Sequence, residues 1–220
     1  YLLNHICIMI ILATGLNVVK GFAGQVTVGH VALAAVGAFT SAVLSTKFGM
    51  PFWVCMPVAV CVTVITGAIV AVPSFRLEGA YLALATLAFA QSVEIFIRIT
   101  NYLGAASGIG GVQPPSFFGI VLRDYGAYYY LVMPLTVLAV YASFAILKSA
   151  TGRAFMAIRE DPLSAAATGV NVKRFKLLAF MLSAAYAGLA GSLMAHMLPG
   201  YIHPNNFTII EMVVVLLMVV

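Results

Sequence analysis

The chain has 220 residues, of which 63% are hydrophobic and 8% are charged, and its formal net charge is +5. In a soluble domain about a quarter of the residues are charged, so this composition excludes a soluble protein and predicts several membrane crossings. In such a protein the basic residues report orientation and not nucleic-acid binding. The chain starts with Tyr1 and stops at Val220 inside an apolar stretch, so we expect a single transmembrane domain, 1–220, trimmed at both ends.

Apolar segments long enough to cross a bilayer recur along the chain. About 20 helical residues cross the roughly 30 Å hydrocarbon core. Runs such as 213–220 do not alternate with period two, which argues against barrel strands. We therefore predict an all-α fold, a polytopic transmembrane helix bundle with six spans and the start of a seventh. The predicted spans are 1–19, 27–45, 51–72, 80–99, 127–147, 177–198 and 207 onward.

A glycine-rich segment, 20–30, separates the first two predicted spans. Glycine permits backbone bends, and non-helical backbone at membrane depth is tolerated only where it is buried in protein or lines water. One interpretation is a broken helix that borders a translocation path. The other is a cytoplasmic turn followed by an ordinary span, with His30 hydrogen-bonded in the packing. The candidates for the path are Gly21, Gly24, Gln25, Gly29 and His30.

The fourth predicted span contains ionisable side chains. Glu94 precedes Arg98 by four residues, the favourable order for an ion pair on one helix face. A charge at the bilayer centre costs roughly 2.5–3.5 kcal/mol on insertion scales. We therefore expect Glu94 either to pair with Arg98 near the outer interface or to serve the path. Glu211, four residues into the last predicted span, has no local partner in the sequence and is a weaker candidate for a cavity.

Small residues recur at helical spacing in the sixth predicted span. They form two neighbouring rows at intervals of four residues, a pattern that lets two helix backbones approach closely. We expect this face to pack tightly in the bundle. The rows are Ala184, Gly188 and Ser192, and Ala187, Gly191 and Ala195.

The basic residues orient the bundle. If the predicted spans alternate in direction, eight basic residues lie at one face and three, Lys47, Arg98 and Arg123, at the other. Cytoplasmic loops carry the excess of Lys and Arg, so the first face is cytoplasmic. Tyr1 then starts on the outer side, and 101–125 is the long outer loop. The cytoplasmic residues are Lys20, Arg76, Lys148, Arg153, Arg159, Lys173, Arg174 and Lys176.

A polar segment of 29 residues, 148–176, holds six of the eleven basic residues. We expect it to form two short helices at the cytoplasmic surface, whose apolar sides rest on the bundle or insert into a partner. A plain amphipathic connector fits the same pattern. The residues that define the helices are Thr151 as the first cap, Asp161 and Pro162 at the second start and Gly169 at its end, with Arg153, Arg159 and Glu160 facing water.

No Ser/His/Asp set, nucleotide motif or cofactor fingerprint occurs in the sequence. We therefore expect no enzymatic activity, no cofactor and no metal in this chain. A membrane enzyme would need His30, His196 and His203 to converge, yet the predicted topology puts His30 near the inner face and the others near the outer. An ion-coupled secondary transporter would need an unpaired acid at the midplane, whereas Glu94 and Glu211 lie toward the outer interface.

Three stretches of the chain resemble a known family, the permease subunits of ABC importers for branched-chain amino acids, of the LivM type. They are 21–30 continued through 37–39, 79–88, and 152–161 extended by 165–169 and 176–180. The resemblance implies an inner-membrane permease that acts with a second homologous permease, an extracytoplasmic solute-binding protein and separate ABC subunits that bind ATP. Related permeases for urea, short amides and aromatic acids share these motifs, so the substrate stays open among these classes.

The third stretch is similar to the cytoplasmic segment through which such permeases dock an ATP-binding subunit. The resemblance thus implies that 148–176 is a coupling segment. Thr27 stands where the family usually has Ser, and the usual aromatic residues after His30 are absent. The implied docking residues are Gly152, Arg153, Arg159, Glu160, Asp161, Ala165, Ala166 and Gly169.

Overall fold

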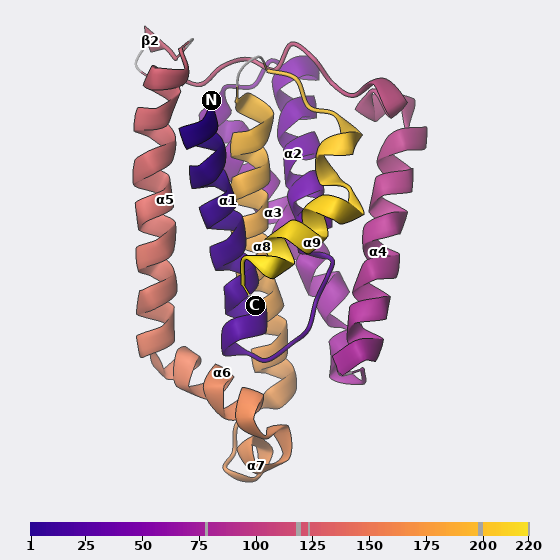
Figure 1. Ribbon diagram of the computed structural model, residues 1–220, viewed down its shortest axis with the longest axis vertical. Coiled ribbons are helices and arrows are strands. Elements are labelled where there is room, and N and C mark those ends of the chain that lie inside the picture. The colour runs from indigo at the N-terminus through magenta and orange to yellow at the C-terminus, as the bar shows by residue number, and fades with distance from the viewer. Residues whose placement is uncertain (78, 118–119, 123, 198–199, 220) are drawn as a thin grey trace.

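The computed structural model describes residues 1–77, 79–117, 120–122, 124–197 and 200–219, and these form a bundle of long helices (Figure 1). Five helical stretches among them are long and apolar enough to cross a membrane, which confirms the predicted fold class. They are Leu2–Phe22, Phe52–Phe75, Gly79–Ile99, Tyr125–Lys148 and Val172–His196.

The second predicted span is a helix of a different kind. It forms α2 (His30–Lys47), which has 18 residues and is less apolar than the five stretches above. Its polar residues include His30, Ser41, Ser45 and Lys47. Most of its side chains are buried in protein, so it is shielded from lipid by its neighbours and tolerates polar residues. The seventh predicted span begins only as a short apolar stretch, Pro204–Leu217.

The remaining elements follow in chain order. Helix α1 (Leu2–Asn17) continues as a π-helical turn, η1 (Val18–Phe22), and α3 (Phe52–Ala71) ends in the 3₁₀ turn η2 (Pro73–Phe75). The loop that was predicted to be external holds two 3₁₀ turns and a two-stranded antiparallel ladder. These elements are η3 (Asn101–Leu103), η4 (Ala105–Ser107), β1 (Ser116–Phe117) and β2 (Ile120–Val121). The other helices are α4 (Gly79–Ile99), α5 (Tyr125–Lys148), α6 (Ala150–Glu160), α7 (Pro162–Ala167), α8 (Val172–His196), η5 (Pro204–Phe207) and α9 (Ile209–Leu217).

The core of the bundle is the contact of α8 with α2 and α3. All six members of the two predicted small-residue rows are buried in it. A Cβ at Gly191 would overlap the backbone of Ala34, and a Cβ at Gly37 would lie 2.8 Å from the Cα of Gly188. Glycine at these positions therefore lets the backbones of α2 and α8 meet, which confirms the predicted close packing.

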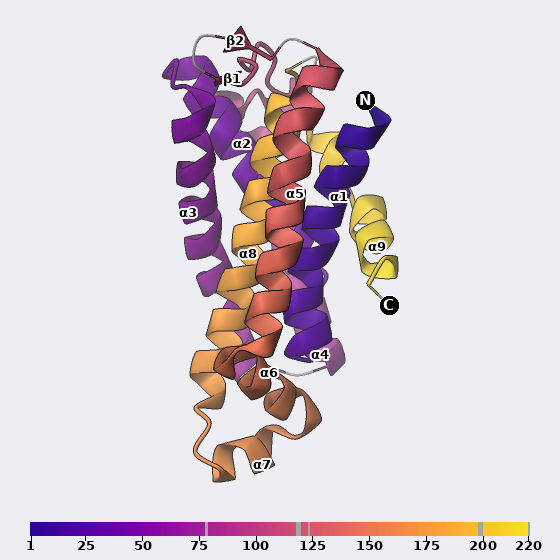
Figure 2. The same cartoon turned by 90° about the vertical axis from the view of Figure 1, so that its left-hand side faces the viewer.

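The two ends of the bundle differ in character. Helices α6 and α7 lie beyond one end, and the N-terminus and the β-ladder lie at the other (Figures 1 and 2). Lys176 donates a hydrogen bond to the Ser74 carbonyl at the α6 end, and Lys47 to the Tyr102 carbonyl at the opposite end. This arrangement agrees with the predicted alternation of the basic residues. Arg123 and Leu198, to which the sequence analysis also refers, lie outside the described residues.

Candidate functional site

The predicted coupling segment, 148–176, contains the two short helices α6 and α7. The prediction that Thr151 caps the first helix is wrong, because Thr151 lies inside α6. The N-cap is Ser149, which has extended backbone and whose Oγ accepts the Gly152 N–H at 3.3 Å. Ser and Thr both serve as caps. The chain already turns into the helix at Ala150, so the residue before it, Ser149, is the cap. The second cap is confirmed. The Asp161 carboxylate accepts the Leu163 N–H at 2.9 Å and the Ser164 hydroxyl at 2.5 Å, with Pro162 next in the chain.

The hydrogen bonds at the start of α7 also affect the charge of its capping residue, Asp161. The hydrogen bonds from the Ser164 hydroxyl and the Leu163 N–H hold the pKa of the Asp161 carboxyl below its usual range. The carboxylate therefore stays ionised near neutral pH. Gly169 has φ +88° just after α7, a conformation that suits glycine and ends the helix as predicted.

One face of the segment rests on the bundle and the other is exposed. Phe155 and Ile158 of α6 are buried, and the Phe155 ring meets Phe175 of α8 edge to face at 6.1 Å. On α7, Leu163 is 81% exposed and Ala166 is exposed beside it, whereas Ala165 is buried. Sequence reasoning missed Leu163. The signal in the sequence was an apolar side chain in a short surface helix, but whether it faces the bundle or water depends on how α7 packs.

Arg159 joins the coupling segment to the glycine-rich segment. Its Nη1 donates a hydrogen bond to the Gly21 carbonyl at 2.5 Å, although the two residues are 138 positions apart. Gly24 has φ +68°, and a Cβ there would lie 2.9 Å from Cγ and 3.2 Å from Cα of Arg159. The structure therefore brings two of the predicted groups together: the end of α6 packs directly on the turn that leaves the first span.

The glycine-rich segment is non-helical between η1 and α2. The Gln25 N–H donates to the Val19 carbonyl at 3.0 Å, and the Val28 N–H donates to the Thr86 hydroxyl of α4 at 3.1 Å. The Gln25 side chain is buried, and no described residue gives its Oε1 a hydrogen bond. The segment thus contacts α6 through Gly24 and α4 through Val28.

His30 begins α2 and is held in the packing of three helices. Its Nε2 lies 2.9 Å from the Leu12 carbonyl of α1, and its Nδ1 lies 3.0 Å from the Ser183 hydroxyl of α8. A carbonyl only accepts, so Nε2 carries the proton and Nδ1 accepts from Ser183. This geometry matches the second of the two interpretations of the segment. A role of the segment in the path stays a prediction.

Three other polar side chains that the sequence analysis singled out, Glu94, Arg98 and His196, are also paired. Arg98 donates to Glu94 at 2.9 Å and to Asn205 Oδ1 at 2.8 Å, which confirms the predicted i,i+4 pair. Near the outer end, His196 Nδ1 donates to the Gln113 carbonyl at 2.7 Å, and its Nε2 accepts from Ser41 at 2.9 Å. The two buried histidines, His30 and His196, therefore have different hydrogen-bond partners and share none. No group of three or more His, Cys, Asp or Glu within the described ranges is placed to hold a metal ion.

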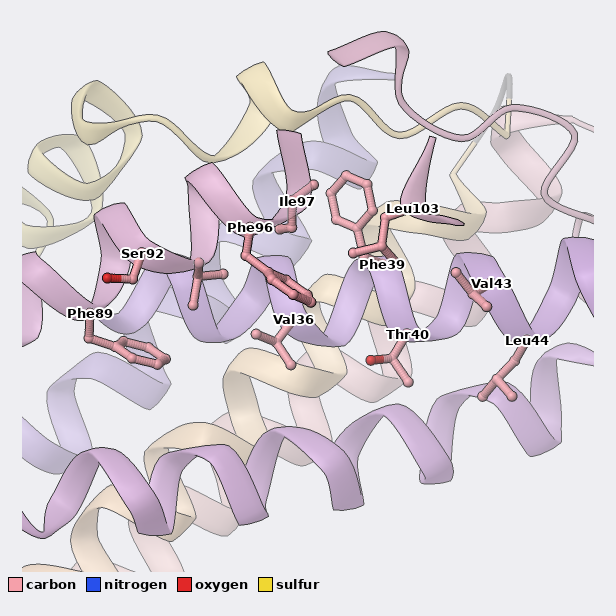
Figure 3. A pocket seen from close by; sticks show the side chains of 11 residues that line it. Val36, Phe39, Thr40, Val43, Leu44, Phe89, Ser92, Phe96, Ile97 and Leu103 are labelled. Atoms are coloured by element: carbon pink, nitrogen blue, oxygen red, sulfur yellow. The ribbon is translucent and has the colours of Figure 1, made fainter. Parts of the chain in front are cut away.

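Two large cavities open between helices of the bundle. The first, about 560 Å³, lies between α2 and α4, whose side chains face each other across it (Figure 3). Its walls are aliphatic and aromatic, and Thr40 and Ser92 add only hydroxyl groups. The second, about 460 Å³, lies between α1 and α9 and includes His5 and Glu211. The two spaces differ in that the second has ionisable side chains.

Comparison with known proteins gives a consistent match over the whole chain. A family model described as "Branched-chain amino acid transport system / permease component" matches residues 1–220. The protein "High-affinity branched-chain amino acid transport system permease protein LivM" of Escherichia coli (strain K12) is 35% identical over 237 aligned positions, and that of Salmonella typhimurium (strain LT2) is equally similar. Each alignment covers 97% of this chain and 56% of the relative, so the chain spans just over half the length of these relatives. No solved structure matches.

Proposed function

The chain belongs to the branched-chain amino acid transport permease family, and from that premise we propose that it is one of two permeases in an ATP-driven ABC importer. The importer carries branched-chain amino acids inward across a bacterial inner membrane. An extracytoplasmic binding protein delivers the solute, a second homologous permease completes the pore, and separate ABC subunits bind and hydrolyse ATP. The names of the two relatives support the substrate class.

The observation that carries the proposal is the exposed helix pair α6 and α7. A soluble ATPase moves a membrane bundle only if it pushes on something exposed and firmly seated. Leu163 and Ala166 offer an exposed apolar surface, while Phe155 and Ile158 fix α6 to the bundle. The buried core of an interface is depleted of charged residues, and covering a side chain such as Leu163 removes apolar surface from water, which favours the contact. We assign α7 to the contact with the ATP-binding subunit and α6 to the transmission of the movement.

The transmission has a defined first step in this proposal. Movement of α6 reaches the glycine-rich segment through Arg159 and Gly24, and passes from there to α4 through Val28 and Thr86. Glycine-rich backbone absorbs such changes in φ and ψ. The segment 21–30 is therefore the candidate hinge beside the path, and Glu94 on α4 lies further along the same connection.

The experiment separates docking from transmission in the complete reconstituted complex. Leu163→Glu places a charge on the apolar surface of α7, and we expect it to abolish co-purification of the ATPase and leucine uptake. The matched control is Lys173→Glu, an exposed charge reversal in the same segment outside the docking candidates, which should leave both intact. The resemblance implies a docking role for Arg159, but its Nη1 is hydrogen-bonded to Gly21. We therefore expect Arg159→Ala to keep the ATPase bound and to lower uptake.

Three results would contradict the proposal. The first is normal binding of the ATPase to the Leu163→Glu complex. The second is uptake of leucine without the ATPase when an ion gradient is applied, which would indicate a secondary transporter. The third result is stimulation of ATP hydrolysis by urea, a short amide or an aromatic acid and not by leucine, isoleucine or valine. That result would assign the chain to another substrate class of the same family.

A further inference from the structure

Glu211 is an acid in the apolar region of the bundle without a counterion among the described residues. It lies in the first turn of α9 and is partly buried, and no described group forms an ion pair or a hydrogen bond with it. Glu94, in a spanning helix, is paired with Arg98. Ionisable groups at membrane depth are costly, face cavities and mark ligand pathways. A lone carboxylate here therefore calls for a cationic partner that is not part of the described chain.

The carboxylate borders the groove between α1 and α9, which lie side by side (Figure 2). His5 borders the same groove. Its Nδ1 is enclosed and has no hydrogen-bond partner among the residues that the structure places, so Nε2 is the ring nitrogen that can reach a ligand. The hydroxyl of Thr14 is already used, since it donates to the Ile10 carbonyl at 2.6 Å. The remaining walls are aliphatic or thioether side chains: Ile6, Met9, Ile10, Ala13, Val214 and Met218.

We propose that this groove binds an aliphatic α-amino acid, whose ammonium group is held by Glu211 and whose carboxylate accepts a hydrogen bond from His5. The aliphatic side chain of the ligand lies against the apolar wall between them. The inference rests on the proposed function and assigns the charged groups of its substrate to two side chains. The groove volume of about 460 Å³ lies within the range of roughly 300–1,000 Å³ that small-molecule sites occupy.

The chemistry of the groove selects this class of ligand over others. A carboxylate in an apolar wall favours an organic ammonium group, because the pair is strengthened by low local dielectric. A divalent cation would require more oxygen ligands than one carboxylate supplies. The larger cavity between α2 and α4 has room for an aliphatic chain, but its lining contains no charged side chain to match an ammonium group.

The test uses the complete transporter with its ATPase, second permease and binding protein in liposomes. Glu211→Gln keeps the size of the side chain and removes its charge. Losing a charge-assisted hydrogen bond lowers binding about ten- to hundredfold, so we expect leucine uptake below saturation to fall by that factor. Ser92→Ala, a polar deletion in the α2–α4 cavity, is the control and should transport leucine at the wild-type rate.

Two leucine analogues distinguish a binding role from a structural one. The amine 3-methylbutan-1-amine lacks the carboxylate, and 4-methylpentanoate lacks the ammonium group. We expect Glu211→Gln to lose inhibition by the amine and to keep inhibition by the acid, and His5→Ala to show the reverse. If Glu211 only stabilises the first turn of α9, the substitution weakens both inhibitors equally, and the proposed site is overturned.

A second measurement reports occupancy directly. Val214→Cys, in a chain whose three native cysteines are replaced by alanine, places a thiol in the groove. Leucine should protect this thiol from a maleimide in the Glu211 background and not in the Glu211→Gln background. If the unmodified complex imports no branched-chain amino acid, the proposed function fails. If the complex imports leucine, but Glu211→Gln changes neither the protection of the thiol by leucine nor the inhibition by the two analogues, the proposed site is wrong and the proposed function stands.

Discussion

Gly24 is the position at which one methyl group should disturb the transmission of movement without removing any docking residue. Its φ of +68° lies in the left-handed region, where a residue with a Cβ costs about 1–2 kcal/mol. The added Cβ would also lie 2.9 Å from Cγ of Arg159, so the end of α6 must shift. A difference of 1–2 kcal/mol changes a two-state population by a factor of about 5–30. Any glycine with a left-handed φ shares this strain, so only the clash with Arg159 acts on the contact with α6. We therefore expect Gly24→Ala to lower leucine uptake by up to about that factor.

The assay compares uptake with ATP hydrolysed in the reconstituted complex, after co-purification shows that the ATPase is bound. Gly49→Ala is the matched control, because Gly49 has φ +61° and nothing lies within 4 Å of its added Cβ. Both substitutions impose the same backbone strain, and only Gly24 contacts α6. We expect more ATP per leucine with Gly24→Ala alone. Equal ratios in both variants and the wild type would refute a connection through this contact.

Three further predictions address stability and local structure. Gly191→Ala should destabilise the bundle by about 1–3 kcal/mol, because its Cβ overlaps the Ala34 backbone; an unchanged thermal midpoint in detergent would contradict the close packing. Ser41→Ala leaves the buried Nε2 of His196 without its donor and should cost about 1–3 kcal/mol, measured in the same way against the exposed Ser92→Ala. The pKa of Asp161 is lowered in the folded chain, so its stabilisation of α7 is present above the usual carboxyl pKa and is lost as pH falls through the lowered value. The protection factor of the Leu163 amide, corrected for the intrinsic pH dependence of exchange, should therefore fall only in that acidic range, and Asp161→Asn should remove this fall.

Local signals in the sequence predicted the parts of the site that depend on neighbouring residues. Asp161 followed by Pro162 identifies the start of α7, because a capping carboxylate and a proline at the first helical position act within one turn. Glu94 and Arg98 pair because four residues place them on one helix face. The choice of Ser149 over Thr151 was not predictable, since both can cap and the turn after α5 decides between them.

Contacts between residues far apart in the chain could not be predicted from the sequence. The hydrogen bond from Arg159 to Gly21 joins residues 138 positions apart, and nothing in either segment encodes the other as its partner. The presence of Glu211 and His5 in one groove depends likewise on how α9 lies against α1. His30 was identified from its segment, but its partners Leu12 and Ser183 follow only from the packing of three helices.

The most direct test of the central claim concerns the exposed side of α7. A single Cys at position 163, in a chain without native cysteines, is treated with a membrane-impermeant maleimide in vesicles of known orientation. We predict labelling in inside-out vesicles alone, and protection when the ATP-binding subunits are added back. Labelling from the outside, or labelling unaffected by those subunits, would contradict the assignment of α6 and α7 as the cytoplasmic coupling segment.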